Sequence, residues 1–297
     1  MFKSGFIGII GRPNVGKSTL LNAVMGEKIA ITTHKPQTTR NRIMGIKNLP
    51  DVQMIFLDTP GIHKASTPLN RSMVKAATDT FGNADILLLL VEATAGVHRE
   101  DLFIIKSFEN AKLPVVLIIN KIDVIEKKLL LPMIDQFRQL YHFVDIIPIS
   151  ALAGDGISIV LDAVRDLLPE GPPLFPDDMI TDRSERFIAA EMIREKITML
   201  MHQEIPYVTA VMVESFKEDE AKNLIRIQAT INVEKDSQKG IIIGKKGAML
   251  KQIGTEARLD MEKFFAARIF LELFVRVQKD WTHNKKMLEE FGYAGKS

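Results

Sequence analysis

Cysteine is absent from the 297 residues of this sequence. The absence excludes disulfides, thiolate zinc sites, iron–sulfur clusters and a cysteine nucleophile, and it fits a reducing compartment. Long hydrophobic runs are absent as well. The longest obvious one, residues 86–91, is far shorter than the roughly 18 apolar residues that a membrane-spanning helix needs. Residues 6–10 are too few for a secretory signal and are expected to form a first strand.

An excess of either charge is also missing, because 39 Lys and Arg residues face 37 Asp and Glu residues. The net charge of +2 is too small to indicate nucleic-acid or membrane binding from bulk charge. Any such partner must therefore be recognised by local clusters. With 46% hydrophobic and 26% charged residues, the chain has the composition of a soluble globular protein. At roughly 150 residues per domain, its length indicates two domains.

The first 170 residues alternate short apolar runs with helix-length stretches. The runs at 86–91 and 115–119 are apolar throughout, which is typical of parallel strands covered on both faces. The pattern predicts an α/β fold with a doubly wound, mostly parallel sheet. The expected strands are residues 6–10, 52–57, 86–91, 115–119 and 146–149, with an edge strand at 42–47; the expected helices are 17–25, 68–81, 101–110, 130–141 and 157–168.

Four prolines between Pro169 and Pro176 mark a domain boundary, since neither helices nor central strands tolerate them. The predicted division is a first domain at 1–170, a linker at 171–178 and a second domain at 179–297. In the second domain, Asp182 and Glu185 have the spacing of a capping box, which would start an amphipathic helix ending near His202. Residues 225–233 alternate apolar and polar side chains, as in a strand with one wetted face.

Beyond that strand come a glycine loop at 240–247, a helix at 248–264 and a strand at 269–277. The second domain is therefore expected to be α+β.

A phosphate-loop pattern, GxxxxGK[ST], lies between the first expected strand and the first expected helix. Glycines at both ends let consecutive N–H groups and the helix N-terminus face a phosphate. Lys17 can add a charge between the β- and γ-phosphates, and the Ser18 hydroxyl can bind Mg²⁺. The predicted nucleotide-binding residues here are Gly11, Arg12, Pro13, Asn14, Val15, Gly16, Lys17, Ser18 and Thr19.

A carboxylate follows the strand at 52–57, in the sequence Asp58-Thr59-Pro60-Gly61. Asp58 is the expected second anchor for Mg²⁺. The Gly61 N–H could donate a hydrogen bond to a γ-phosphate and be released when that phosphate leaves. The alternative reading is an ordinary strand-ending turn, because Asp, Pro and Gly are all turn residues. The next residue, Ile62, is apolar and cannot orient an attacking water, so slow intrinsic hydrolysis is expected. The predicted nucleotide-binding residues of this segment are Asp58, Thr59, Pro60, Gly61 and Ile62.

Base selection is assigned to Asn120-Lys121-Ile122-Asp123, after the strand at 115–119. The Asp123 carboxylate can accept hydrogen bonds from the N1–H and the exocyclic amine of guanine, whereas adenine offers neither donor at these positions. Ser150-Ala151 is expected to bring a backbone N–H to the guanine O6. All these loops follow strands at one edge of the sheet, where open α/β sheets bind ligands. The sequence therefore predicts a GTP site.

With these motifs, the sequence resembles translation-factor-class GTPases and, within them, the Era family, over nearly its whole length. The resemblance makes residues 36–40 the first switch and assigns a metal-binding hydroxyl to Thr39, with Thr38 as the alternative. Ser18, Thr39 and Asp58 are then the expected Mg²⁺ ligands, and Asn14, Lys17, Thr39 and Gly61 the expected catalytic residues. In related GTPases an asparagine at the place of Asn14 helps to hold a potassium ion, which could offset the negative charge that develops during hydrolysis.

The order of elements in the second domain is that of a type II KH RNA-binding domain, with residues 242–247 as its Gly-x-x-Gly loop. Five lysines between Lys235 and Lys251 face one acid, Asp236. Such a cluster alone is more often a solvated loop, but the surrounding topology favours RNA. Trp281 and Phe291 are expected to pack in the core rather than to stack on a base. The predicted RNA-binding residues are Ile243, Gly244, Lys245, Lys246, Gly247 and Lys251.

The resemblance implies a GTP-hydrolysing switch that binds small-subunit (16S) rRNA near its 3′ end and acts in assembly of the small ribosomal subunit. It also implies a cytoplasmic, monomeric protein with peripheral contact at the inner face of the cell membrane. Two rival readings are weighed against it. A P-loop nucleoside or nucleotide kinase would have no reason to carry residues 120–123 or a KH domain. An RNA-binding module with a structural, non-switching nucleotide domain would be expected to have degraded motifs, whereas Lys17, Ser18, Asp58 and Asp123 are all present.

Overall fold

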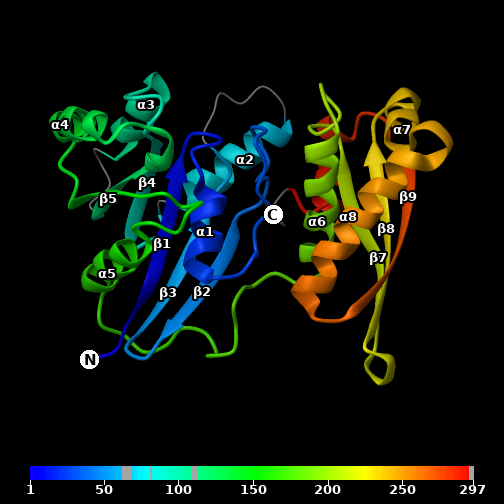
Figure 1. Cartoon of the computed structure of the whole chain (residues 1–297), viewed down its shortest axis with the longest axis horizontal. Helices are drawn as coiled ribbons and strands as arrows, with labels where there is room; N and C mark the ends of the chain where they lie inside the picture. The colour runs from blue at the N-terminus through cyan, green and yellow to red at the C-terminus, as the bar shows by residue number, and fades with distance from the viewer. Residues whose placement is uncertain (62–67, 81, 109–112, 294–297) are drawn as a thin grey trace. The chain divides into compact units, whose positions relative to one another are not determined.

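A computed structural model describes residues 1–61, 68–80, 82–108 and 113–293 (Figure 1). Two compact units make up the chain. The first contains residues 1–30, 39–65 and 73–182, and the second contains residues 31–38, 66–72 and 183–297. A short piece of the N-terminal half, residues 31–38, therefore belongs to the C-terminal unit, whereas the residues on either side of it belong to the first unit.

The first unit contains a six-stranded sheet in the order β2-β3-β1-β4-β5-β6. All neighbouring strands are parallel except β2 and β3. Strand β2 lies at one edge of the sheet, so the edge strand predicted at 42–47 is confirmed, at residues 43–49. The elements are β1 Lys3–Gly11, α1 Lys17–Met25, β2 Ile43–Leu49, β3 Val52–Asp58, β4 Ile86–Glu92, α3 Arg99–Ser107, β5 Val115–Asn120, α4 Leu130–Leu140, β6 Asp145–Pro148 and α5 Ile157–Leu167; helix α2, Pro68–Asp79, is divided between the second unit and the first.

Helices cover both faces of this sheet, which confirms the doubly wound arrangement. On one face, Ile104 and Phe108 near α3 and Phe137 of α4 pack against Leu89 and Leu117. Helices α1 and α5 contact each other and the sheet strands. Residues 86–91 of β4 are all fully buried, as expected for a central parallel strand with helices above and below. Each such side chain contributes roughly 1.5–3 kcal/mol by burial.

Strand register places the functional loops at one edge of the sheet. Ile9 of β1 lies opposite Asp58 of β3, Gly11 lies opposite Leu90 of β4, and Glu92 lies opposite Asn120 of β5. The carboxyl ends of these parallel strands therefore end at the same level. The loops that follow them share one site.

The proline-rich segment, residues 169–176, and the residues that follow it are hydrogen-bonded to the sheet of the first unit. The Gln53 side chain donates 2.8 Å to the Phe175 carbonyl and accepts the N–H groups of Leu174 and Phe175. The Ile46 N–H donates 2.9 Å to the Ile180 carbonyl. Fixed by these bonds, the segment belongs to the first unit up to Asp182.

The second unit contains a three-stranded sheet in the order β7-β8-β9, with β7 antiparallel and β9 parallel to β8. Its core joins Ile193 of α6, Ile227 and Ile231 of β8, Ile242 of α7 and Met261 of α8. Its elements are α6 Glu185–Leu200, β7 Ala210–Asp219, β8 Leu224–Val233, α7 Asp236–Ile243, α8 Ala248–Phe265, β9 Arg268–Val277 and α9 Lys285–Glu290.

Two expectations for α6 were wrong. The helix is capped by Ser184, whose hydroxyl accepts the Phe187 N–H, and not by Asp182. A serine directly before the helix satisfies an orphan N–H as well as an aspartate would, and Ser184 is the residue that directly precedes the helix. The helix is also not amphipathic, because the charged residues Glu191, Arg194 and Glu195 are buried along with its apolar residues.

The polar face of β8 is wetted over only half its length. Arg226 and Gln228 are exposed as expected, but Thr230 and Asn232 are buried. Trp281 is fully buried, donates 2.9 Å to the Val208 carbonyl and meets the Phe291 ring edge-on, so the expected core packing is confirmed. Among the residues that the structure describes, no helix is both long and apolar enough to cross a bilayer.

Candidate functional site

The phosphate loop runs from the end of β1 into α1, where Gly16 adopts a left-handed conformation as the residue before the helix. The Lys17 ammonium is folded back onto this loop and donates 3.1 Å to the Gly11 carbonyl and 2.8 Å to the Arg12 carbonyl. Burial lowers the pKa of Lys17 to about 8, against an opposing effect of Asp58. A buried cation at a helix N-terminus suits an anionic phosphate.

Arg12 extends away from this loop to α3, where its Nε donates 2.8 Å to the buried carboxylate of Asp101. The other oxygen of Asp101 accepts the His98 N–H in a capping box. Arg12 therefore ties the phosphate loop to α3. Sequence analysis gave Arg12 a nucleotide-binding role and missed Asp101, which no local motif identifies.

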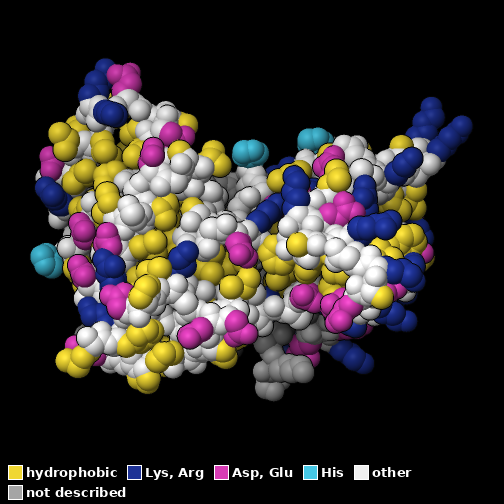
Figure 2. Space-filling model, turned by 60° about the horizontal axis from the view of Figure 1, so that its bottom comes forward, with side chains coloured by type: hydrophobic (Ala, Val, Ile, Leu, Met, Phe, Trp, Pro, Cys, Tyr) yellow, Lys and Arg dark blue, Asp and Glu magenta, His cyan; other side chains and the backbone are white. Residues whose placement is uncertain are grey.

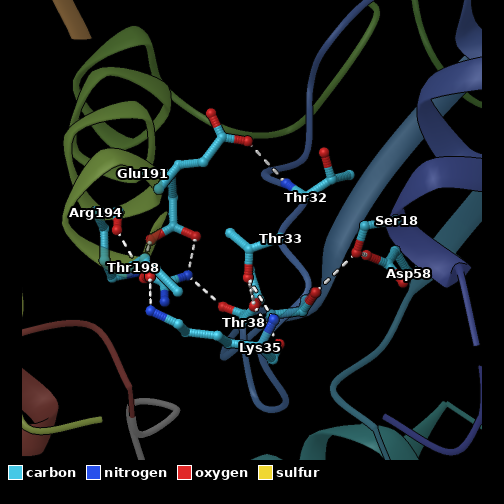
Figure 3. Close-up of polar contacts among 11 residues, drawn as sticks. Ser18, Thr32, Thr33, Lys35, Thr38, Asp58, Glu191, Arg194 and Thr198 are labelled. Carbon is cyan, nitrogen blue, oxygen red and sulfur yellow. Dashed lines mark hydrogen bonds and ion pairs between the residues drawn. The ribbon is translucent and has the colours of Figure 1, made fainter. Parts of the chain in front are cut away.

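Three oxygens that were predicted to bind a metal come together beside the loop. Ser18 Oγ donates 2.6 Å to Asp58 Oδ2 and lies 2.8 Å from Thr39 Oγ1 (Figure 3). The second oxygen of Asp58, Oδ1, is buried and has no hydrogen-bond partner among the described residues. Burial raises the pKa of Asp58 to about 6, against the effects of Lys17 and Ser18. An orphan carboxylate oxygen next to two hydroxyls fits a hard divalent cation.

The structure separates the two threonines that sequence left as alternatives. Thr38 Oγ1 lies 2.6 Å from Thr33 Oγ1 and donates 2.8 Å to the Lys35 carbonyl, so this hydroxyl is engaged inside its own segment. Thr39 Oγ1 instead lies 2.8 Å from Ser18 Oγ, which in turn donates to Asp58. The geometry therefore favours Thr39 as the ligand.

Residues 58–61, which the family resemblance makes the second switch, pack against the phosphate loop at Gly61. A Cβ added to Gly61 would lie 2.6 Å from the nitrogen and 2.7 Å from the Cα of Pro13, so no side chain fits there. Thr59 is buried and donates 2.8 Å to the Ile9 carbonyl, which anchors the segment to β1. The predicted site residue Ile62 lies outside the described residues.

At the base-binding end, Asn120 links two loops. Its amide nitrogen donates 2.8 Å to the Val15 carbonyl, and its amide oxygen accepts the Ala151 N–H at 2.9 Å. The Ser150 N–H donates to the Asp155 carbonyl, so a guanine O6 would share the Ala151 N–H with Asn120. Lys121 pairs with Glu92 at 2.5 Å.

The carboxylate that was predicted to select the base, that of Asp123, faces solvent. Asp123 lies in a single 3₁₀ turn, residues 122–124, and is exposed. It can therefore meet an incoming base without displacing a buried partner.

The Gly-x-x-Gly loop of the second unit joins α7 to α8. Gly244 and Gly247 both have positive φ, and Lys246 between them has a φ of 52°. Lys245, Lys246 and Lys251 are exposed, while Ile243 is half-buried. In Figure 2, Lys and Arg side chains gather over the part of the visible face that belongs to the second unit. The loop thus presents backbone and cations together.

A groove that sequence analysis missed continues from this loop between α8 and β9. Its volume is about 380 Å³, and Gly247, Lys251, Gly254, Arg258 and Leu273 are among its lining residues. Gly254 is close enough to β9 that a Cβ would lie 3.3 Å from Leu273 Cδ1. A glycine inside a predicted helix was the signal that could have located the groove.

Comparisons with known proteins agree with both halves of this description. A family model described as "50S ribosome-binding GTPase" matches residues 6–121, and one described as "KH domain" matches residues 204–282. GTPase Era of Syntrophus aciditrophicus is 69% identical, with 99% of this chain and 96% of that protein covered. GTPase Era of Geotalea uraniireducens is 56% identical, with 98% of each covered.

Two solved structures match over 99% of this chain and 100% of their own, each at 42% identity and a TM-score of 0.95. One is Era in complex with MgGDPNP and nucleotides 1506–1542 of 16S ribosomal RNA. The other is a single-residue variant of Aquifex aeolicus Era bound to GDP and AlF4⁻. These identities extend over at least 98% of the chain, and the GTPase and KH models match in that order along the sequence. The chain therefore belongs to the Era family of GTPases.

Proposed function

We propose that this GTPase is a switch whose nucleotide state controls binding to small-subunit (16S) rRNA, near its 3′ end, during assembly of the small ribosomal subunit. The observation that carries the proposal is the presence, in one chain, of the Ser18–Thr39–Asp58 oxygen cluster and the exposed Gly244–Gly247 lysine loop. The related Era structure, described in complex with MgGDPNP and 16S ribosomal RNA, supports the pairing of these two ligands.

The residues of the first unit divide the work along the nucleotide. The phosphate loop and Lys17 hold the phosphates, and Asp123, with Asn120 and Ala151, holds the base. Ser18, Thr39 and Asp58 would hold Mg²⁺, which when bound neutralises charge on the phosphates. Gly61, which packs on Pro13, is proposed to donate its backbone N–H to the γ-phosphate. Loss of that phosphate would break this hydrogen bond and release the Gly61 N–H.

Asn14 is proposed to help hold a potassium ion beside the phosphates. It is exposed at the tip of the phosphate loop and has a φ of 63°. A monovalent cation there would stabilise negative charge that develops in the transition state. In the second unit, Ile243, Gly244, Lys245, Lys246, Gly247 and Lys251 are proposed to contact RNA phosphates.

Location and assembly state are proposed from the family resemblance alone. We expect a cytoplasmic monomer that contacts the inner face of the cell membrane peripherally. Fractionation of cells at low and high salt would check this expectation, because a peripheral protein leaves the membrane fraction when salt is raised.

Base selection offers the sharpest test of the nucleotide assignment. The full chain should bind GTP and GDP and should not bind ATP, because only guanine donates to the Asp123 carboxylate. Asp123→Asn should move the preference to xanthine nucleotides, since an amide can donate to a 2-oxo group. Calorimetric titration with GDP, ADP and xanthosine diphosphate measures this. Asp162→Asn, on the exposed side of α5, is the matched control. Equal binding of ADP and GDP by the wild type would refute the assignment.

A further inference from the structure

Helix α6 of the second unit buries several charged side chains. Arg194 is 1% exposed, and its guanidinium makes a two-point pair with Glu191 at 2.7 and 2.6 Å. Replacing such a buried pair by apolar residues is often neutral or stabilising. Its presence therefore calls for a role beyond stability.

The remaining donor capacity of this pair is directed at residues 31–38. Arg194 donates from the same terminal nitrogen, 2.5 Å, to the Thr38 carbonyl (Figure 3). The next residue of the helix, the fully buried Glu195, accepts the Thr32 N–H at 2.9 Å. Lys35 donates to the carbonyls of Thr198 and Met201 at the end of α6. Three charged side chains thus fasten one short segment to one helix.

The fastened carbonyl stands directly before the proposed metal ligand. A peptide unit is planar, so a hydrogen bond that fixes the Thr38 carbonyl also fixes the N–H of Thr39. Glu191 holds Arg194 in one rotamer, and Arg194 holds that plane. The Thr39 side chain that follows lies 2.8 Å from Ser18 Oγ, which in turn donates to Asp58. Arg194 therefore acts on Thr39 through the chain itself.

We propose that Arg194, held by Glu191, is a positioning residue for Mg²⁺-dependent GTP binding, which presents the Thr39 hydroxyl to the metal-binding oxygens and so raises affinity for GTP over GDP. The inference rests on the proposed role of Thr39 as a metal ligand. A GDP complex lacks the γ-phosphate to which the first switch closes, so it gains less from a preset Thr39. A preset ligand lowers the ordering cost of binding.

The test measures equilibrium affinities of the full chain for a non-hydrolysable GTP analogue and for GDP, with Mg²⁺ and with chelator. Arg194→Lys keeps the charge but loses the fixed fork, and Lys35→Met releases the segment at a half-buried position. Each should weaken the GTP analogue about tenfold with Mg²⁺, the size of one charge-assisted hydrogen bond. GDP affinity should stay within about twofold, and chelator should abolish the difference.

Thr198→Val is the matched control, because the buried Thr198 hydroxyl donates only to the Arg194 carbonyl within the helix. It should leave both affinities unchanged. Thr39→Val separates the two proposals. If Thr39→Val leaves the Mg²⁺-dependent preference for GTP intact, the metal role of Thr39 is wrong. If Thr39→Val removes that preference while Arg194→Lys and Lys35→Met both keep it, the positioning role of Arg194 is wrong.

Discussion

The buried carboxylate of Asp58 gives a prediction about the pH dependence of stability. Burial raises its pKa from 3.8 to about 6 in the folded chain without metal. The folded state therefore keeps a proton that the unfolded state has already lost between these two values. Stability from this group is full below about pH 4 and falls as pH rises to about 6. A shift of this size corresponds to about 3 kcal/mol.

Asp58→Asn should remove this loss. Without nucleotide or metal, the variant should be stabilised relative to the wild type by up to about 3 kcal/mol more at pH 7.5 than at pH 4. Denaturant unfolding of both proteins at the two pH values measures the difference, and the exposed Asp162→Asn serves as control. A stability difference between the two proteins that does not change with pH would show that burial does not raise the pKa of the Asp58 carboxylate.

Asn14 gives a second prediction, which separates a catalytic from a structural asparagine. GTP hydrolysis should be faster in potassium than in sodium at equal ionic strength, and Asn14→Ala should remove the difference. Single-turnover hydrolysis in the two salts measures it. Identical wild-type rates would leave Asn14 with a purely structural role in the loop and would place the acceleration with bound RNA or a protein partner.

The side chains that sequence identified and those that it missed differ in one physical respect. Lys17, Ser18 and Asp58 belong to a pattern with fixed spacing, so local sequence predicts them. Arg194 and Asp101 act through partners 156 and 89 positions away. Partners so far apart in the sequence form no local motif that could predict their contact. Only the folded chain brings them together.

Hydrophobic periodicity predicted the existence and type of nearly all the helices and strands for which a residue range was given. Helix α1 begins and ends where it was expected, because the phosphate loop sets its start and Gly26 its end. Helix α6 shows where periodicity fails. Its charged residues face protein rather than water, so the expected amphipathic pattern is not its real organisation. The first strand of the second unit, β7, was expected in the order of elements but not located.

The loop between α7 and α8 is best probed through its lysines. A Cβ on Gly244 would lie 2.6 Å from the Met249 Cβ, and its φ is +70°, so substitution there would strain the fold. Lys245 and Lys246 are exposed and can be changed without that cost.

Lys245→Gln with Lys246→Gln should weaken single-stranded RNA binding without altering GTP hydrolysis. Each lost phosphate contact should reduce the slope of log affinity against log salt by about 0.7. Filter binding over a salt series measures both quantities. Lys285→Gln with Lys286→Gln, an exposed lysine pair at α9, is the matched control. If both pairs behave alike, the loop has no special role in RNA binding.

For the molecule as a whole, nucleotide and RNA are proposed to be linked. If GTP strengthens RNA binding by some factor, RNA must strengthen GTP binding by the same factor. Typical couplings of this kind amount to about 5- to 150-fold. The segment 31–38 could couple the nucleotide site to the RNA-binding unit, because it belongs to the second unit while Thr39, the next residue, belongs to the first.

RNA affinity of the full chain in two nucleotide states tests this proposal most directly. A single-stranded RNA from the 3′ end of the small-subunit rRNA is titrated with protein saturated by a non-hydrolysable GTP analogue or by GDP, at one fixed salt concentration. We expect binding at least about fivefold tighter in the GTP-analogue state. Equal affinity in the two states would contradict the proposal that this GTPase controls RNA binding through its nucleotide.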